Sequence, residues 1–306
     1  MGDRTIKVLV PGTSANCGPG FDTIGVACTI YNELSLTLRH EPGLRIDITG
    51  EGAGNIPCDT RNIVWRSIQY ILKKAGLTEE YQGAYIHMFN RIPLSRGLGS
   101  SAAAIVAGLK ASNVLIGNRY SRRELLQMAV EIEGHPDNVA PAIFGGFTIS
   151  VVTGEKTECF SFIPKVPLKL VVAVPEFPLS TRAARNVLPQ EVPLKDAVFN
   201  VSRAALMIAA LCKGNPQFLK NAFDDALHQP YREKLIPGMQ DVFRAAREAG
   251  ALGASMSGAG PCLIAFTTEQ SEAVGEAMVQ AFQKHEIRAK YLLLDIDPRG
   301  VHIAKN

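Results

Sequence analysis

A glycine- and serine-rich segment, residues 93–103, places the strongest constraint on how this chain folds. It reads Pro93-Leu94-Ser95-Arg96-Gly97-Leu98-Gly99-Ser100-Ser101-Ala102-Ala103. Residues 84–89 before it have the pattern of a strand, and the Ala- and Leu-rich run at 99–116 is typical of a helix. The segment therefore predicts a tight turn that joins a strand to a long helix.

This turn has the features of a phosphate site. Gly97 and Gly99 allow a tight bend that exposes successive N–H groups, and a helix start offers free N–H groups and the positive end of the helix dipole. The hydroxyl of Ser100 or Ser101 suits a metal ion that bridges phosphates. The segment lacks the GK[ST] ending of a Walker A loop and the third glycine of a Rossmann motif. A helix start capped by a serine is the alternative interpretation.

Strands and helices alternate irregularly along the rest of the chain, which favours two α+β layers over one long βαβ array. Residues 121–133 predict a helix in which Ser121 and Glu124 form a capping box. Other expected elements are strands at 7–10, 44–49, 168–174, 262–267 and 288–294, helices at 198–213, 216–228, 238–249 and 271–285, and a surface loop at 186–197. Pro164 and Pro167 precede an apolar strand, so we expect domains at residues 1–165 and 166–306.

Composition excludes several classes of protein. Hydrophobic residues make up 46% and charged residues 20%, as in a globular protein with a sizeable core. A net charge of +3 without a basic run gives no reason to expect a nucleic-acid partner. No apolar stretch reaches the roughly 18 residues of a membrane span. The six cysteines show no CxxC spacing, so we expect reduced thiols and a cytoplasmic location.

Residues 93–103 resemble the ATP-binding motif of the GHMP kinases. Two further segments resemble motifs of that family, in its order and spacing: PGTSANCGPGFD at 11–22 and GASMSGAGP at 253–261. The resemblance covers nearly the whole chain. It implies an α+β, two-domain fold with a ribosomal protein S5 domain 2-like N-terminal domain and a ferredoxin-like C-terminal domain. It also implies ATP as phosphoryl donor, Mg²⁺ as its partner and a homodimer.

The acceptor follows from the same resemblance. The form of residues 11–22, with EGHPDNVAP at 133–141 and STRAAR at 180–185, resembles family members that phosphorylate the hydroxyl of L-homoserine on the route to threonine. The substrate-binding residues implied are Asn16, Asp22, His135, Thr181, Arg185 and Arg232. Asn16 and Asp22 suit the ammonium and hydroxyl end. A guanidinium fork at Arg185 and Arg232 matches a carboxylate, with Arg182 as a substitute for Arg185 and a surface position as the alternative for Arg232.

The resemblance also assigns the nucleotide and metal positions. Residues 93–103 would hold ATP, and Asn62 would contact adenine, with an Asx turn before a helix as its alternative. Ser101 and Glu133 are the candidate Mg²⁺ ligands. Glu131 is the other candidate carboxylate. The alternative interpretation is that both glutamates are solvated charges at the end of a helix.

Three residues are candidates for the chemical step. Asp137 and Asn138 lie where a proton acceptor would fall, and Arg185 completes the catalytic set. Phosphoryl transfer through a loose transition state needs little activation of the nucleophile. We therefore expect Asn138 to orient the reacting groups and Asp137 not to act as a strong base.

Two other functions compete with this one. One is a kinase of the same family that acts on mevalonate or shikimate; two arginines and a carboxylate around the acceptor favour an amino acid instead, and mevalonate would not need Asp22. A ligand-sensing homologue without catalytic activity would tend to lose motif residues, whereas the serines, glycines and glutamates are all present here.

Overall fold

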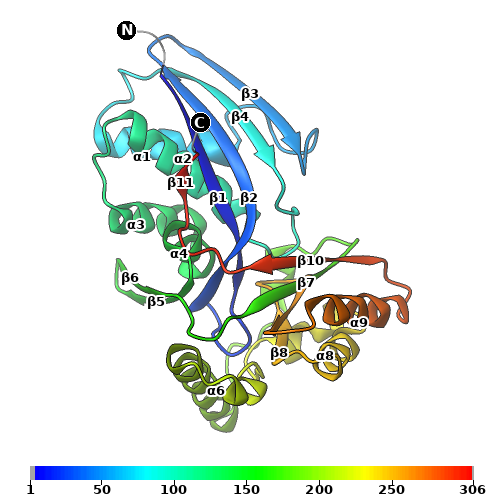
Figure 1. The fold of residues 1–306 in the computed structure, drawn as a ribbon. Coiled ribbons are helices and arrows are strands. Elements are labelled where there is room, and N and C mark those ends of the chain that lie inside the picture. Colours follow the sequence, from blue (N-terminus) through cyan, green and yellow to red (C-terminus); the bar gives the residue numbers. More distant parts are fainter. Residues whose placement is uncertain (1–3, 305–306) are drawn as a thin grey trace.

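The computed structural model describes residues 4–304 and contains two sheets with helices packed against them (Figure 1). The first sheet has the strand order β11-β1-β2-β4-β3, and β5 pairs with both β2 and β6. Among the strands of the described residues, only β3 and β4 pair in parallel. Its strands are β1 (Thr5–Ala15), β2 (Ile24–Arg39), β3 (Gly43–Gly50), β4 (Gly83–Asn90), β5 (Phe147–Thr153), β6 (Lys156–Phe162) and β11 (His302–Ile303).

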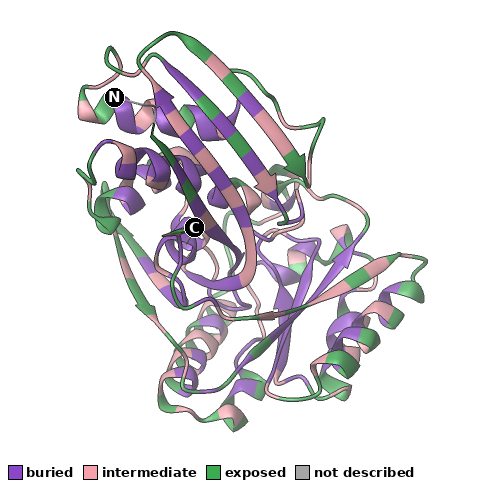
Figure 2. Ribbon diagram, turned by 45° about the horizontal axis from the view of Figure 1, so that its top comes forward, coloured by how far each residue is buried: buried purple, intermediate pink, exposed green. Residues whose placement is uncertain are grey.

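Four helices accompany this sheet: α1 (Ile63–Ala75), α2 (Ser100–Leu115), α3 (Arg122–Glu133) and α4 (Pro136–Phe144). α2 and α4 lie on β1 and β2, and α1 and α3 flank α2. The central helix α2 is buried nearly all round, from Ala102 to Leu109, because alanine and glycine let neighbouring elements approach it closely. Figure 2 shows the resulting buried layer between the helices and the sheet.

The second sheet is antiparallel throughout, with the order β10-β7-β9-β8. Its strands are β7 (Lys169–Pro175), β8 (Gly253–Met256), β9 (Leu263–Thr267) and β10 (Ala289–Asp295). Helices α8 (Met239–Glu248) and α9 (Ser271–Gln283) pack on it. The remaining elements are α5 (Thr181–Asn186), α6 (Leu194–Lys213), α7 (Gln229–Arg232) and two 3₁₀ turns, η1 (Pro216–Asn221) and η2 (Glu233–Leu235).

The chain passes from the first sheet to the second between β6 and β7, where the sequence places the boundary at 165/166. The chain returns to the first sheet at β11, which pairs antiparallel with β1 and places Ile303 opposite Val8. The last described residues therefore lie on the sheet of the first half.

Among residues 4–304, no helix combines the length and apolar character needed to cross a membrane.

The α+β prediction is confirmed, as are the helix at 99–116 and the Ser121–Glu124 capping box. Two local predictions are wrong. No helix spans 216–228, because the chain forms the η1 turn and the Asp225 carboxylate then accepts the backbone N–H groups of the following residues. The surface loop at 186–197 ends early, because α6 begins at Leu194, directly after Pro193.

Candidate active site

A cavity of about 300 Å³ brings the three glycine-containing segments together. It is lined by most of the residues that the sequence nominated: Asn16, Asp22, residues 93–101, Glu133, His135, Asp137, Asn138, Thr181, Arg185 and Arg232. Gly258 and Ala259, from the third segment, complete this wall. Residues more than 200 positions apart in the sequence therefore share one site.

Hydrogen bonds fix the 93–99 loop to both other segments. The Thr13 N–H donates to the carbonyl of Leu98 at 3.0 Å. The Ser257 hydroxyl donates to the carbonyl of Gly97 at 2.7 Å and lies 2.9 Å from the hydroxyl of Ser14. A side chain at Gly97 would not fit, because a Cβ there would lie 2.0 Å from the carbonyl oxygen of Ser257. The loop is thus held rigidly at the start of α2.

The N-terminus of α2 opens into this cavity. Gly99 is the N-cap residue, with φ +68°, and no side chain caps the first turn. Ser100 and Ser101 in that turn line the cavity. A 16-residue helix presents partial positive charge and free N–H groups at this end, which suits a phosphate group.

Ser101 and Glu133 meet across the cavity wall, where the Ser101 hydroxyl donates to Glu133 Oε2 at 3.0 Å. Burial raises the pKa of Glu133. Glu131 points elsewhere, since its carboxylate accepts from the Tyr70 hydroxyl and lies 3.4 Å from Lys74 Nζ. No cluster of three or more His, Cys, Asp or Glu side chains that suits a metal occurs in the described part of the chain. Two hard oxygen donors fit Mg²⁺, which takes few protein ligands beside substrate phosphates.

Asn62 lies outside the cavity lining. Its side chain is buried and caps α1, since Oδ1 accepts the Val64 N–H at 2.9 Å and Nδ2 donates to the Pro57 carbonyl at 2.7 Å. Ala102 and Ala103 are also absent from the lining, being buried within α2. Three large apolar residues of the wall were not predicted from the sequence: Ile56, Ile63 and Met88. None of them lies within a recognisable motif, and an apolar residue carries no other mark of a binding role.

Asp22 and Arg185, which both line the cavity, form a bidentate ion pair. The two guanidinium nitrogens donate to the two carboxylate oxygens at 3.0 and 2.7 Å. This hydrogen bonding raises the pKa of Arg185. Asn16 supports the arrangement, because its Oδ1 accepts the Asp22 N–H at 3.0 Å and its Nδ2 donates to the Gly258 carbonyl at 2.9 Å.

Arg232 is buried, with 2% of its surface exposed, so the alternative of a surface arginine is wrong. Its Nε donates to the carbonyl of Ala184 at 3.0 Å, beside Arg185. Burial and the neighbouring Arg185 lower the pKa of Arg232 to about 10, which leaves it charged at neutral pH. Arg182 is exposed and is not part of the cavity wall.

His135, Asp137 and Asn138 lie beside the start of α2. His135 Nδ1 is 2.8 Å from Asp137 Oδ1, and this contact raises the pKa of His135. The Thr13 hydroxyl donates to Asn138 Oδ1 at 2.9 Å. The carboxylate of Asp137, which is buried, is therefore already paired.

Comparisons with known proteins agree with this geometry. The model of the GHMP kinase N-terminal domain matches residues 62–146, and that of the GHMP kinase C-terminal domain matches residues 207–285. The chain belongs to the GHMP kinase family.

Among its relatives are homoserine kinases. The chain is 46% identical to the homoserine kinase of Moorella thermoacetica, over 92% of this chain and 94% of that protein. It is 43% identical to that of Carboxydothermus hydrogenoformans, over 96% and 95%. The crystal structure of homoserine kinase from Cytophaga hutchinsonii superposes with a TM-score of 0.91 at 34% identity, covering 99% of this chain and 98% of that one.

Proposed function

We propose that this protein is a homoserine kinase, which transfers the γ-phosphoryl group of ATP to the hydroxyl of L-homoserine. One observation carries the proposal. A single cavity is lined both by the first turn of an uncapped helix and by Asp22, Arg185 and Arg232. The helix N-terminus suits the phosphates of ATP, and the charged side chains supply opposite charges for the ammonium and carboxylate of an amino acid. The homoserine kinases among the relatives support the same substrate.

On the nucleotide side, the N–H groups at the start of α2 and the 93–99 loop hold the phosphates. Ser101 and Glu133 would hold Mg²⁺, which neutralises phosphate charge when it is bound. The pairing of Ser101 with Glu133, rather than with Glu131, supports this assignment. We propose that the apolar wall at Ile56, Ile63 and Met88 receives the adenine, with Asn62 acting indirectly by fixing the start of α1.

On the acceptor side, the Asp22–Arg185 pair must exchange partners when substrate binds. Asp22 then accepts from the ammonium group, and Arg185 and Arg232 donate to the carboxylate. Asn138, fixed by Thr13, orients the hydroxyl toward the phosphate. Asp137 is engaged by His135, so the hydroxyl proton passes to the transferred phosphate rather than to a protein base.

The test is an ADP-release assay with Mg²⁺-ATP and five acceptors: L-homoserine, L-serine, L-threonine, mevalonate and shikimate. We expect kcat/KM for L-homoserine to exceed the others by at least about a hundredfold, because the alternatives lose either a charge contact or the correct chain length. Preference for mevalonate or shikimate would contradict the acceptor assignment and leave the nucleotide assignment standing. ATP binding without turnover of any acceptor would contradict the enzymatic function and favour a ligand sensor.

We further propose that the protein is a homodimer that acts in the cytoplasm. Leu194, Val198 and Val201 are exposed at helical spacing along α6, which gives that helix an apolar stripe available for a second copy. The six cysteines are all free thiols, as expected in a reducing compartment. Light scattering on the purified protein tests the first point, and Val198→Lys should shift a dimer towards monomer.

A further inference from the structure

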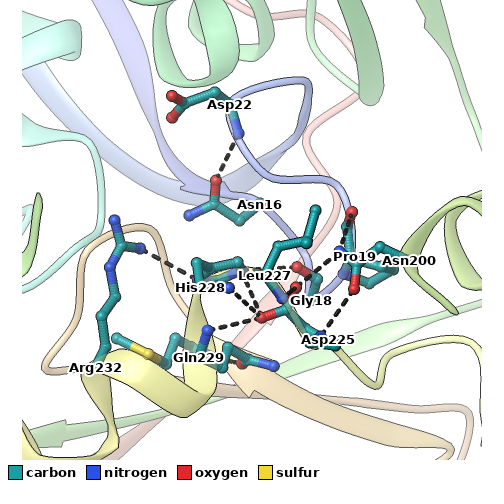
Figure 3. Close-up of polar contacts among 12 residues, drawn as sticks. Asn16, Gly18, Pro19, Asp22, Asn200, Asp225, Leu227, His228, Gln229 and Arg232 are labelled. Atoms are coloured by element: carbon teal, nitrogen blue, oxygen red, sulfur yellow. Dashed lines mark hydrogen bonds and ion pairs between the residues drawn. The ribbon is translucent and has the colours of Figure 1, made fainter. Parts of the chain in front are cut away.

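Only part of the Arg232 guanidinium makes hydrogen bonds to the rest of the protein. Nε donates to the carbonyl of Ala184 at 3.0 Å. Nη1 lies 3.2 Å from His228 Nδ1 and 3.4 Å from the carbonyl of Gly258. The described residues supply no acceptor to Nη2, and Arg232 lines the cavity. In Figure 3 its guanidinium extends beside His228 toward the turn that carries Asn16 and Asp22. Nε and Nη1 are therefore held by the protein, and Nη2 is available to a ligand.

His228 is the only side chain among these acceptors, and its own position is fixed. The ring has no exposed surface and stacks on Phe21, with ring centroids 5.1 Å apart. Nε2 lies 2.8 Å from the carbonyl of Gly18. A carbonyl only accepts, so Nε2 carries the hydrogen and Nδ1 has a lone pair directed at Arg232. Burial lowers the pKa of His228 and so favours this neutral form.

A second layer of hydrogen bonds holds His228 in place (Figure 3). Asp225 Oδ2 accepts the N–H groups of His228 and Gln229 at 2.9 and 2.7 Å. Asn200 Nδ2 donates to Asp225 Oδ1 at 2.8 Å and to the carbonyl of Pro19 at 3.1 Å. Both Gly18 and Pro19 belong to the first glycine-containing segment. The network thus joins α6, the α7 turn and the segment that carries Asn16 and Asp22.

We propose that His228 is a positioning residue for substrate recognition. Its neutral imidazole accepts a hydrogen bond from Arg232 Nη1 and so orients Nη2 of that guanidinium toward the carboxylate of the acceptor. This inference rests on the proposed function, because it assigns the amino-acid carboxylate to Arg232. His228 itself touches neither substrate nor nucleotide.

Two conservative variants separate this role from simple packing. Asn places an amide oxygen near the position of Nδ1, so His228→Asn retains the acceptor for Arg232. Gln places its amide nitrogen near Nε2, so His228→Gln retains the bond to Gly18 and fills more of the space. We expect His228→Gln to raise KM for L-homoserine about tenfold or more, the range for a hydrogen bond to a charged group, and His228→Asn to raise it less than about threefold. If the ring serves only to fill space, the order reverses, because Asn leaves the larger void.

Four further measurements complete the test. KM for ATP should change less than twofold in both variants, and His285→Gln, which alters a histidine bonded to Asp241 on α8, should change no constant. In an Arg232→Gln background, His228→Gln should add less than about twofold to KM. With 3-aminopropan-1-ol, which is L-homoserine without its carboxylate, His228→Gln should perform like the wild type.

The outcomes distinguish the two levels of the argument. A wild-type protein that does not phosphorylate L-homoserine contradicts the proposed function before any variant is made. If the wild type is active, three results contradict the role of His228 and leave the proposed function standing. They are equal KM values for the two variants, a higher KM for His228→Asn than for His228→Gln, and a full tenfold effect of His228→Gln in the Arg232→Gln background. If His228→Gln does not fold, His228→Asn with KM raised tenfold or more also overturns the proposal.

Discussion

Gly97 offers the sharpest test of how the three segments form one site. Its φ is +78°, and a Cβ at this position would lie 2.0 Å from the carbonyl oxygen of Ser257 and 3.0 Å from the N–H of Gly260. Both neighbours are backbone atoms, which no rotamer change can move. In Gly97→Ala the loop and the 257–260 turn must separate by more than 1 Å to reach an ordinary contact of 3.4 Å or longer.

Two costs follow from this substitution. The left-handed backbone costs alanine about 1–2 kcal/mol. The separation also removes the 2.7 Å hydrogen bond between Ser257 and the Gly97 carbonyl, which costs about 1 kcal/mol. Gly97→Ala should therefore lose about 2–3 kcal/mol of the free energy of unfolding. Because a misplacement of about 1 Å at a site costs on the order of a hundredfold in rate, we expect kcat/KM for ATP to fall by about that factor.

Gly117→Ala is the matched control. Gly117 also has a left-handed backbone, with φ +89°, but it lies beyond the other end of α2 with no atom within 4 Å of an added Cβ. This variant should show only the backbone cost and unchanged kinetics. Urea unfolding and steady-state kinetics of both variants provide the measurements. A Gly97→Ala protein with wild-type kcat/KM for ATP, and no less stable than Gly117→Ala, would refute the interlocking of the segments.

Three further substitutions test other parts of the site and the fold. Glu133→Gln should raise the Mg²⁺ concentration for half-maximal ATP binding in calorimetry by at least about tenfold, whereas Glu131→Gln should leave it unchanged; equal effects would contradict the choice between the two. Asp137→Asn should slow kcat by less than about a thousandfold at every pH tested, since larger losses are typical of removing a general base. Glu33 bridges Lys7 and Arg91, and Lys7 lowers its pKa, so its contribution is present above the ordinary glutamate value of about 4.3 and is lost as pH falls through the lowered pKa. Glu33→Gln should therefore cost no more than about 1 kcal/mol at pH 7, and the difference should shrink as the pH of urea unfolding is lowered below the ordinary glutamate pKa. A difference that does not depend on pH would disprove the ionic origin.

The features that the sequence predicted correctly are local ones. The start of α2, its approximate length and the Ser121–Glu124 capping box depend on residues within a few positions of one another. The strand at 44–49 was visible because its alternation reflects the two faces of one strand, and it forms the greater part of β3. Such features need no knowledge of what the segment packs against.

Features that depend on distant partners were not predictable in the same way. Arg232 looks like a surface residue in its own segment, and only contacts with residues 184 and 258 make it buried. The helix expected at 216–228 fails because Asp225 binds backbone N–H groups rather than joining a helix. Glu131 and Glu133 are indistinguishable by pattern, and their roles separate only when α3 is placed against α1 and α2.

The 93–99 loop, which we propose binds the nucleotide, also holds the segment that leads to the proposed acceptor residues. The Leu179 N–H donates to the carbonyl of Ser95 at 3.3 Å, and Arg96 Nη2 donates to the carbonyl of Glu176 at 2.7 Å. Residues 176–180 lead directly into α5, which carries Thr181 and Arg185. The segment that presents Arg185 to Asp22 is therefore anchored to the segment that precedes the N-terminus of α2. Phosphoryl transfer depends mainly on the relative position of donor and acceptor, and these two bonds add to the contacts that fix that position across the two sheets.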